Sequence, residues 1–337
     1  MSDSGLVQPA GPIGQDGSGH AHAGEAQRPP DPDGQQTSSG GQSLWSDARR
    51  DLLRNPVFMV SLFVVLVVVS WAAFPGLWTD LGKTDCDIKV SKQPPLWLPL
   101  DLPPGVAQGD LAGGHPLGTT VLGCDMYSQV IWGARPSIVV GVLVTGLVAL
   151  IGTTLGILSG YFGGWTDTII SRVTDVLLGL PFVLGALVFL ALLQSQSIWA
   201  VTLVLVALAW TTMSRIVRGS VLSLRDQDFV DAARAMGATD GRIILRHILP
   251  NALAPVIVLS TLYIGTFISA EATLTFLGVG LKAPEISWGI TIADGQNLAV
   301  AGFPHLLIFP CIALIVTVLS FILMGDALRD ALDPKGR

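Results

Sequence analysis

One stretch of this sequence, residues 176–214, contains no charged residue and is far longer than one membrane-spanning helix requires. As a single α-helix it would measure roughly 58 Å, at about 1.5 Å per residue, whereas the hydrocarbon core of a bilayer is about 30 Å thick. A polar sequence, Gln194-Ser195-Gln196-Ser197, interrupts the run near its middle. The stretch therefore predicts a hairpin of two transmembrane helices.

Four other runs have the length and composition of transmembrane helices, in keeping with a chain that is 50% hydrophobic and only 13% charged. The first predicted helix covers residues 57–75. Residues 136–166, 248–270 and 305–325 supply the second, fifth and sixth. The sequence thus predicts an all-α integral membrane protein with six transmembrane helices, five of them in a core of residues 136–325.

The segments outside these runs differ in composition. Residues 1–42 are rich in Gly, Pro, Ser, Gln and Asp and predict a disordered tail, because they cannot bury enough apolar surface to offset the entropy of ordering. Residues 43–56 combine leucine and tryptophan with arginine, which is typical of an amphipathic helix at a membrane interface. The proline-rich residues 76–135 predict an irregular or partly folded outer loop. Residues 278–304 predict a second polar loop, and residues 326–337 a short tail.

Basic residues are distributed unevenly between the two sides of this topology. With the N-terminus in the cytoplasm, most of the 19 lysines and arginines fall in cytoplasmic segments. The outer segments hold only Lys83, Lys89, Lys92, Arg135 and Lys282. The positive-inside rule therefore places both termini in the cytoplasm, together with the polar stretch between the fourth and fifth helices.

That polar stretch, residues 228–251, carries a short helix with its own start and stop signals. Asp228 predicts an N-cap, and Asp231 three residues later predicts something like a capping box. Gly237 predicts a left-handed stop, and Thr239 the cap of a second helix. A short helix with a small-residue face between two membrane spans suits a docking element.

The amino-acid sequence of this stretch resembles a motif of a known protein family. Asp231-Ala232-Ala233, Gly237 and Ile248-Leu249-Pro250 resemble the EAA loop of bacterial binding-protein-dependent ABC transporter permeases. The fuller string, from Asp228-Phe229 to Arg246-His247-Ile248-Leu249-Pro250-Asn251, resembles the dipeptide and oligopeptide branch, of the DppC/OppC type. Asp231 stands where the family's motif usually has Glu, and His247 where the general motif has Ile. Residues 115–119 and 133–135 also resemble the peptide branch.

The resemblance implies an importer-type permease fold with a cytoplasmic coupling helix, in a multi-pass protein of the bacterial inner membrane. It implies a transport subunit without enzymatic activity, which forms half of a translocation path for di- and oligopeptides and couples ATPase closure to alternating access. The implied partners are a second homologous permease, two cytoplasmic ATPase subunits or domains and an extracytoplasmic substrate-binding protein, with no nucleic acid. ATP and magnesium belong to the ATPase subunits, and no cofactor or metal is expected in this chain.

The coupling role falls on residues of the EAA-like stretch. Phe229 and Met236 would offer apolar contacts, and Ala232 and Ala233 would leave room for a partner's groove. Arg234 and Arg242 would meet acidic partners. The full predicted set is Asp228, Phe229, Asp231, Ala232, Ala233, Arg234, Met236, Gly237 and Arg242.

Three alternatives remain beside this hypothesis. The same fold could import nickel, another metal chelate or haem. A proton-coupled secondary carrier is a different class, but it predicts ionisable residues within the spans, which are nearly bare of them. A membrane-embedded enzyme is disfavoured because the sequence contains no catalytic cluster.

Two features inside the apolar runs are candidates for packing or function. Gly152, Gly156, Gly160 and Gly164 recur every four residues, a spacing that lets two helix backbones approach closely in lipid. Glu271 is the one ionisable residue deep in an apolar run, about 31 Å along a helix from the start of the fifth span. It is a candidate for the translocation path, for snorkelling to the interface, or for a structural hydrogen bond.

The three cysteines fit neither a disulfide scaffold nor a zinc site. Cys86 and Cys124 both fall in the predicted outer loop, the one compartment here where a disulfide would persist. They predict a disulfide, the alternative being two free thiols. Cys311 predicts a buried apolar filler in the sixth span.

Overall fold

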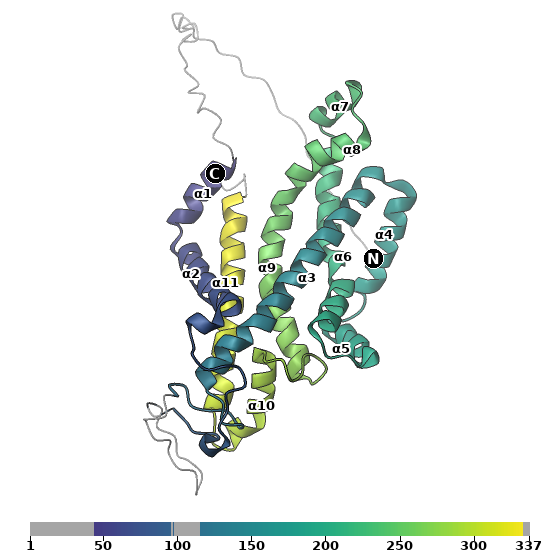
Figure 1. Cartoon of the computed structure of the whole chain (residues 1–337). Coiled ribbons are helices and arrows are strands. Elements are labelled where there is room, and N and C mark those ends of the chain that lie inside the picture. Colours follow the sequence, from purple (N-terminus) through teal and green to yellow (C-terminus); the bar gives the residue numbers. More distant parts are fainter. Residues whose placement is uncertain (1–43, 96, 98–114, 333–337) are drawn as a thin grey trace, which may run out of the picture. The chain divides into compact units, whose positions relative to one another are not determined.

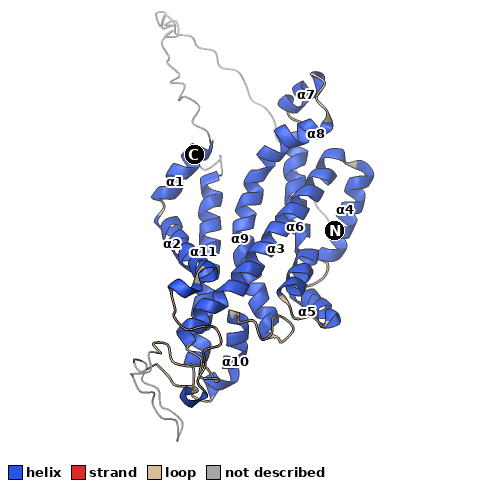
Figure 2. Ribbon diagram, in the orientation of Figure 1, coloured by secondary structure: helices blue, strands red, loops and turns tan. Residues whose placement is uncertain are grey.

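The computed structural model describes residues 44–95, 97 and 115–332. The predicted disordered tail, residues 1–42, lies outside the described residues. In the part that is described, the chain is helical with connecting loops and isolated β-bridges, and it has no strand (Figure 2). The helices are α1 (Leu44–Arg54), α2 (Pro56–Ala73), α3 (Met126–Phe162), α4 (Gly164–Leu178), α5 (Phe182–Leu193), α6 (Ile198–Arg225), α7 (Asp228–Ala235), α8 (Asp240–Ile243), α9 (Leu249–Phe276), α10 (Trp288–Val300) and α11 (His305–Leu332).

Among the described residues, five segments are long and apolar enough to cross a membrane: α2, α3, α6, α11 and residues 240–276, which run through α8 and α9. A π-helical turn, Ile244–Ile248, joins α8 to α9. Helices α4 and α5 form a sixth candidate span if they count as one, although they meet at 89°. Helix α5 alone has 12 residues, about 18 Å at 1.5 Å per residue, and is too short to cross. The prediction of six spans thus agrees with the structure when the third is a bent pair.

The second span begins ten residues before the predicted start at residue 136. The Asp125 carboxylate accepts from the backbone N–H of Ser128 at 2.8 Å and so caps α3 at its first turn. Pro136 therefore lies inside the helix instead of starting it. The predicted outer loop, residues 76–135, is correspondingly shorter and ends at Asp125.

Two further boundaries differ from the prediction. The segment 278–304 is not only loop, because it contains α10. Ser287 caps α10 by accepting from the N–H of Ile290 at 3.3 Å. The fully buried Trp288 donates from its indole N–H to the carbonyl of Val130 at 2.8 Å, which fixes α10 on α3. The sixth span, α11, continues to Leu332 instead of ending at residue 325, so it includes most of the predicted C-terminal tail.

The glycine stripe brings α3 against α6. A Cβ at Gly152 would lie 2.6 Å from the Met213 Cβ, and one at Gly156 would lie 2.7 Å from the Ser214 carbonyl oxygen. A Cβ at Gly160 would lie 2.9 Å from the Val221 Cβ. These three glycines therefore set the spacing of the two helices. Gly164 does not belong to the contact, since it starts α4 with a φ of +54° and faces open space.

The ends of the bundle carry different elements (Figure 1). Helices α7 and α8 connect the last residue of α6 to the start of α9, and α10 follows the far end of α9. The two groups therefore lie at opposite ends, which we call the α7 end and the α10 end. Helix α1, the predicted interfacial helix, packs on α2 and α11. The described parts of the loop between residues 76 and 125 lie at the α10 end.

Candidate functional site

Helix α7 presents the polar stretch that the sequence singles out. Its inward side is anchored by Val230 and Ala233, which are buried in the same apolar cluster as Ile243 and Ile248. The ring of Phe229 lies 6.2 Å from the ring of His247, centroid to centroid. Helix α7 is thus fixed against the turn that leads into α9.

The chain leaves α7 at Gly237, the predicted left-handed stop. Its φ is +80°, a conformation that residues with a Cβ rarely adopt. The N–H of Gly237 donates to the carbonyl of Arg234, and the N–H of Ala238 donates to the carbonyl of Ala233, both at 3.0 Å. This pair of bonds is a Schellman motif. It turns the chain sharply from α7 into α8.

The outward side of α7 carries apolar residues beside the charged Asp228, Asp231 and Arg234. Met236 is 82% exposed and Phe229 is 38% exposed. Ala232 is exposed as well, whereas Ala233, which the sequence predicts to face a partner, is buried inside this chain. Arg242, on α8, is also exposed. The predicted pair of small residues is therefore split, since Ala232 is exposed and Ala233 is buried.

The N-terminal caps of this segment differ from the prediction. Gln227 occupies the N-cap position of α7 instead of Asp228, and its side chain makes no capping bond. No capping box forms, because Asp231 accepts from Arg234 at 3.0 Å on the exposed surface. Thr239 occupies the N-cap position of α8, but its hydroxyl makes no capping bond either. The segment is held mainly by its buried side and its C-terminal turn.

Hydrogen bonds tie the base of this segment to the bundle. The Tyr161 hydroxyl, at the end of α3, donates to the Asp240 carboxylate of α8 at 2.6 Å. Arg225, at the end of α6, donates to backbone carbonyls at the end of α3. Nearby, Arg218 of α6 forms two hydrogen bonds to Asp167 of α4, at 2.5 and 2.7 Å. A displacement of α8 would therefore act directly on the end of α3, which Arg225 joins to α6.

A cavity of about 460 Å³ lies among α4, α5, α6 and α9, beside the bend between α4 and α5. Its lining is apolar apart from Thr211, Thr212, Tyr263 and Thr266. Sequence reasoning does not find this cavity. The available signal is the break at Gly179-Leu180-Pro181, which ends α4 and turns α5 aside. Hydroxyl groups around a cavity in membrane-spanning helices suit the passage of a polar solute.

Glu271 is fully buried and links α3 to α9. Its two carboxylate oxygens accept from the hydroxyls of Ser137 and Thr275, each at 2.9 Å. A carboxylate enclosed in this way does not snorkel to the interface. The arrangement agrees with the structural hydrogen bond and not with snorkelling, while a place on the translocation path stays a prediction.

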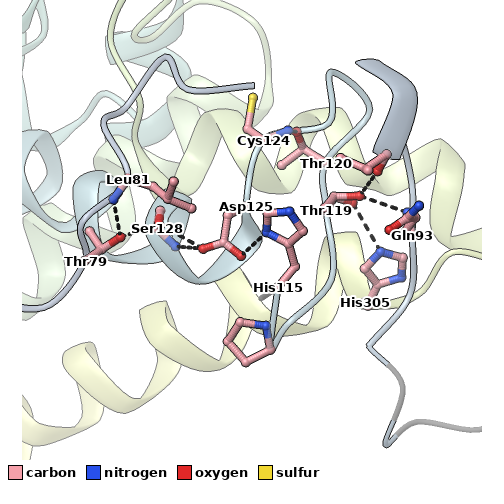
Figure 3. Close-up of polar contacts among 12 residues, drawn as sticks. Thr79, Leu81, Gln93, His115, Thr119, Thr120, Cys124, Asp125, Ser128 and His305 are labelled. Carbon is pink, nitrogen blue, oxygen red and sulfur yellow. Dashed lines mark hydrogen bonds and ion pairs between the residues drawn. The ribbon is translucent and has the colours of Figure 1, made fainter. Parts of the chain in front are cut away.

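The loop at the α10 end is folded in its described parts, in keeping with the partly folded alternative of the prediction (Figure 3). Thr119 is its centre: the Thr119 hydroxyl donates to the carbonyl of Val90 and accepts from the N–H of Gln93. The carbonyl of Thr119 lies 3.4 Å from the Nε2 atom of the buried His305. His115 and Asp125 contact each other at 3.1 Å. These contacts fix the loop to the start of α11 and the start of α3.

A disulfide bond joins Cys86 to Cys124 and closes this loop over 38 residues. Cys311, on α11, is free and partly buried.

Replacing both bonded cysteines by serine is expected to destabilise the loop by about 3–4 kcal/mol, because a closed loop of this length loses entropy in the unfolded chain. Limited proteolysis should then cleave residues 76–125 far faster than in the native protein, while cleavage near α7 stays unchanged. Equal protection of the loop in both proteins, or free thiols at both positions in the non-reduced native protein, would contradict this expectation.

A bundle of membrane-spanning helices, with a helical segment anchored at one end and a cavity with four hydroxyl-bearing residues among the spans, fits a membrane transport permease. The family model described as "Binding-protein-dependent transport system inner membrane component" matches residues 152–337, and that described as "N-terminal TM domain of oligopeptide transport permease C" matches residues 43–95. The chain belongs to this family of ABC transporter permeases, in its dipeptide and oligopeptide branch.

Individual relatives agree with this assignment. A dipeptide transport system permease protein DppC from Alkalihalophilus pseudofirmus is 36% identical over 91% of this chain and 94% of its own length. A glutathione transport system permease protein GsiD from Pectobacterium atrosepticum is 40% identical over 86% of this chain and 91% of its own length. An inward-facing structure of the MetNI methionine ABC transporter matches the fold with a TM-score of 0.51 at 19% identity, over 62% of this chain and 98% of that one.

Proposed function

We propose that this chain is one of two permease subunits of an ATP-driven importer for di- or oligopeptides, and that α7 is its coupling helix. The observation that carries the proposal is the form of α7. It is anchored by Val230 and Ala233 and presents Phe229, Ala232 and Met236 outward, and the adjoining α8 is hydrogen-bonded through Asp240 to Tyr161 at the end of α3.

In this proposal two cytoplasmic ATPase subunits each receive one coupling helix, this chain supplying one and a second homologous permease the other. ATP and magnesium are bound and used there, not in this chain. When the ATPases close, they move α7 and α8 together. The bond between Tyr161 and Asp240 carries this motion to α3, and Arg225 carries it to α6. The cavity lined by Thr211, Thr212, Tyr263 and Thr266 is this chain's half of the translocation path.

The same proposal fixes the orientation in the membrane. The α7 end faces the cytoplasm with both termini, as the excess of arginine on that side favours. The α10 end, with the disulfide-closed loop, faces outward and receives an extracytoplasmic substrate-binding protein. A disulfide persists in an oxidising compartment, which supports this side for the loop.

Peptide cargo is supported by the names of the relatives, whose cargoes are dipeptides, oligopeptides and glutathione. Nickel or another metal chelate, or haem, is the alternative cargo for the same fold. A proton-coupled carrier is less well supported, because Glu271 is enclosed by hydrogen bonds rather than open to a path.

Cysteine labelling tests the orientation and the contact together. In a variant whose free Cys311 is replaced by serine, Met236→Cys is expected to react with an impermeant maleimide only after the cells are permeabilised. Ser195→Cys, in the exposed turn between α5 and α6, should react from outside without permeabilisation. Met236→Cys should also cross-link to an ATPase subunit, and Ser195→Cys should not. The reverse labelling pattern would reject the cytoplasmic docking role of α7.

A further inference from the structure

The α10 end contains two adjacent cavities, of about 610 Å³ and about 400 Å³. Both are lined by Lys83, Thr84, Glu285 and Ile286, so they share one wall. We call the two together the outer groove. Each cavity alone has a volume in the range of small-molecule sites, about 300–1,000 Å³.

The outer groove has a positive charge at one end, a negative charge at the other and one of each sign between them. Arg135 lines only the larger cavity and Asp294 only the smaller one, while Lys83 and Glu285 lie at the shared wall. None of these four side chains forms an ion pair or a hydrogen bond with another residue that the structure describes. The groove therefore offers an unpaired cation at one end and an unpaired carboxylate at the other.

The walls of the outer groove are fixed by contacts that do not involve these charges. Trp132 donates from its indole N–H to the carbonyl of Leu81 at 3.1 Å, and Gln129 donates from its amide to the carbonyl of Lys83 at 3.1 Å. These bonds attach the segment that carries Lys83 to α3. The disulfide between Cys86 and Cys124 borders the smaller cavity. The segment that carries Lys83 is thus held in place by hydrogen bonds and a disulfide.

Between its charged ends the groove is mostly apolar. Trp132 and Val139 line the larger cavity, and Val121, Met126, Ile290 and Leu306 line the smaller one. A cationic end, an apolar middle and an anionic end match a molecule with a carboxylate at one end, a protonated amine at the other and side chains between. An anionic lipid headgroup would use only the cationic end, and it would leave Glu285 at the shared wall and Asp294 at the other end without a cationic partner.

We propose that the outer groove binds the free termini of a peptide, with the carboxylate at Arg135 and the α-amino group at Asp294. This inference rests on the proposed peptide cargo and adds a binding site on the permease itself. Lys83 and Glu285, at the shared wall, bind charged side chains of the peptide, or the termini of peptides too short to reach both ends. Desolvation raises the pKa of the Asp294 carboxyl above its ordinary value, and a bound ammonium group would favour its charged form.

Photo-cross-linking of the full transporter complex in lipid nanodiscs tests the site. The probe is alanyl-4-benzoyl-phenylalanine, used as the free peptide, as its N-acetyl form and as its C-terminal amide. Labelling by the free peptide should map to the groove, to residues such as Trp132 and Ile290. Arg135→Gln should lower labelling by the free peptide about tenfold, the expected loss for one charge-assisted hydrogen bond, and leave labelling by the amide unchanged. Asp294→Asn should lower labelling by the free peptide similarly and leave the N-acetyl form unchanged.

Matched controls remove a charge nearby but outside the groove. Lys89→Gln and Asp80→Asn, both at exposed positions of the same loop, should leave labelling by all three probes unchanged. The proposal would be overturned if neither Arg135→Gln nor Asp294→Asn changed the labelling, or if each variant lowered labelling by all three probes equally. Dependence on Arg135 alone would identify an anionic ligand and would also overturn it.

ATP-driven uptake of the same peptide, measured with the same complex in proteoliposomes, separates this inference from the proposed function. Uptake together with labelling that is independent of Arg135 and Asp294 would reject the outer groove and keep the peptide importer. Charge-dependent labelling without uptake would support the groove as a peptide site and reject ATP-driven import.

Discussion

Replacing Gly156 by leucine is expected to destabilise the helix bundle strongly. Even a methyl group at this position would lie 2.7 Å from the carbonyl oxygen of Ser214 and 2.8 Å from the Cβ of Val217. Both obstacles belong to the backbone or to the root of a side chain, so α3 and α6 must move apart. Overpacking of this kind costs about 1–3 kcal/mol or more, and the purified variant should unfold at a clearly lower temperature.

Gly146 provides a matched control on the same helix. A Cβ there would meet nothing within 4 Å, so Gly146→Leu should unfold at nearly the native temperature and insert in equal amounts. Equal stability of the two leucine variants would show that the glycine stripe does not set the spacing of α3 and α6.

Replacing Met236 by aspartate is expected to abolish the coupling between ATP hydrolysis and uptake while leaving the permease folded. Met236 is 82% exposed, so a charge there disturbs nothing inside this chain. In a partner's groove the same charge would be buried without a counter-ion, at a cost of several kcal/mol. Peptide uptake by the complex should therefore fall by about tenfold or more, whereas the amount of inserted permease stays unchanged.

Met236→Leu is the control for this change, since it keeps an apolar side chain of similar size. It should retain most of the uptake. Normal uptake by the aspartate variant, or equal loss in the leucine variant, would remove Met236 from the docking surface. Ala233→Asp is a poorer test, because Ala233 is buried in this chain and its replacement would damage α7 itself.

The number and order of the spans follow from hydrophobic runs, because a bilayer imposes a minimum length on each apolar helix. The same reasoning fails where a helix begins in polar sequence. The first turns of α3 lie outside the uncharged run and are therefore predicted as loop, although Asp125 with Ser128 is a recognisable N-cap. Helix α10 is predicted as loop for a similar reason, because its buried residue Trp288 lies in a segment of polar composition.

The candidate site is predictable in its location but only partly in its geometry. The position of Gly237 and the exposure of Met236 follow from local sequence rules. Which of Ala232 and Ala233 faces outward depends on how α7 rests on Ile243 and Ile248, a tertiary contact that helix periodicity alone does not fix. The outer groove cannot be predicted from the sequence, because Arg135 and Asp294 lie far apart in the chain and only the fold places them in two adjacent cavities.

Uptake by the reconstituted transporter is the decisive measurement. The complex of this chain with its partner permease, its ATPases and its binding protein is placed in proteoliposomes, and entry of a radiolabelled di- or oligopeptide is followed with ATP. Uptake is expected when both ATP and the substrate-binding protein are present. It should cease with a non-hydrolysable ATP analogue and fall by about tenfold or more with Met236→Asp. Uptake driven by a proton gradient without ATP, or accumulation of a nickel chelate or haem with exclusion of peptides, would contradict the proposed function.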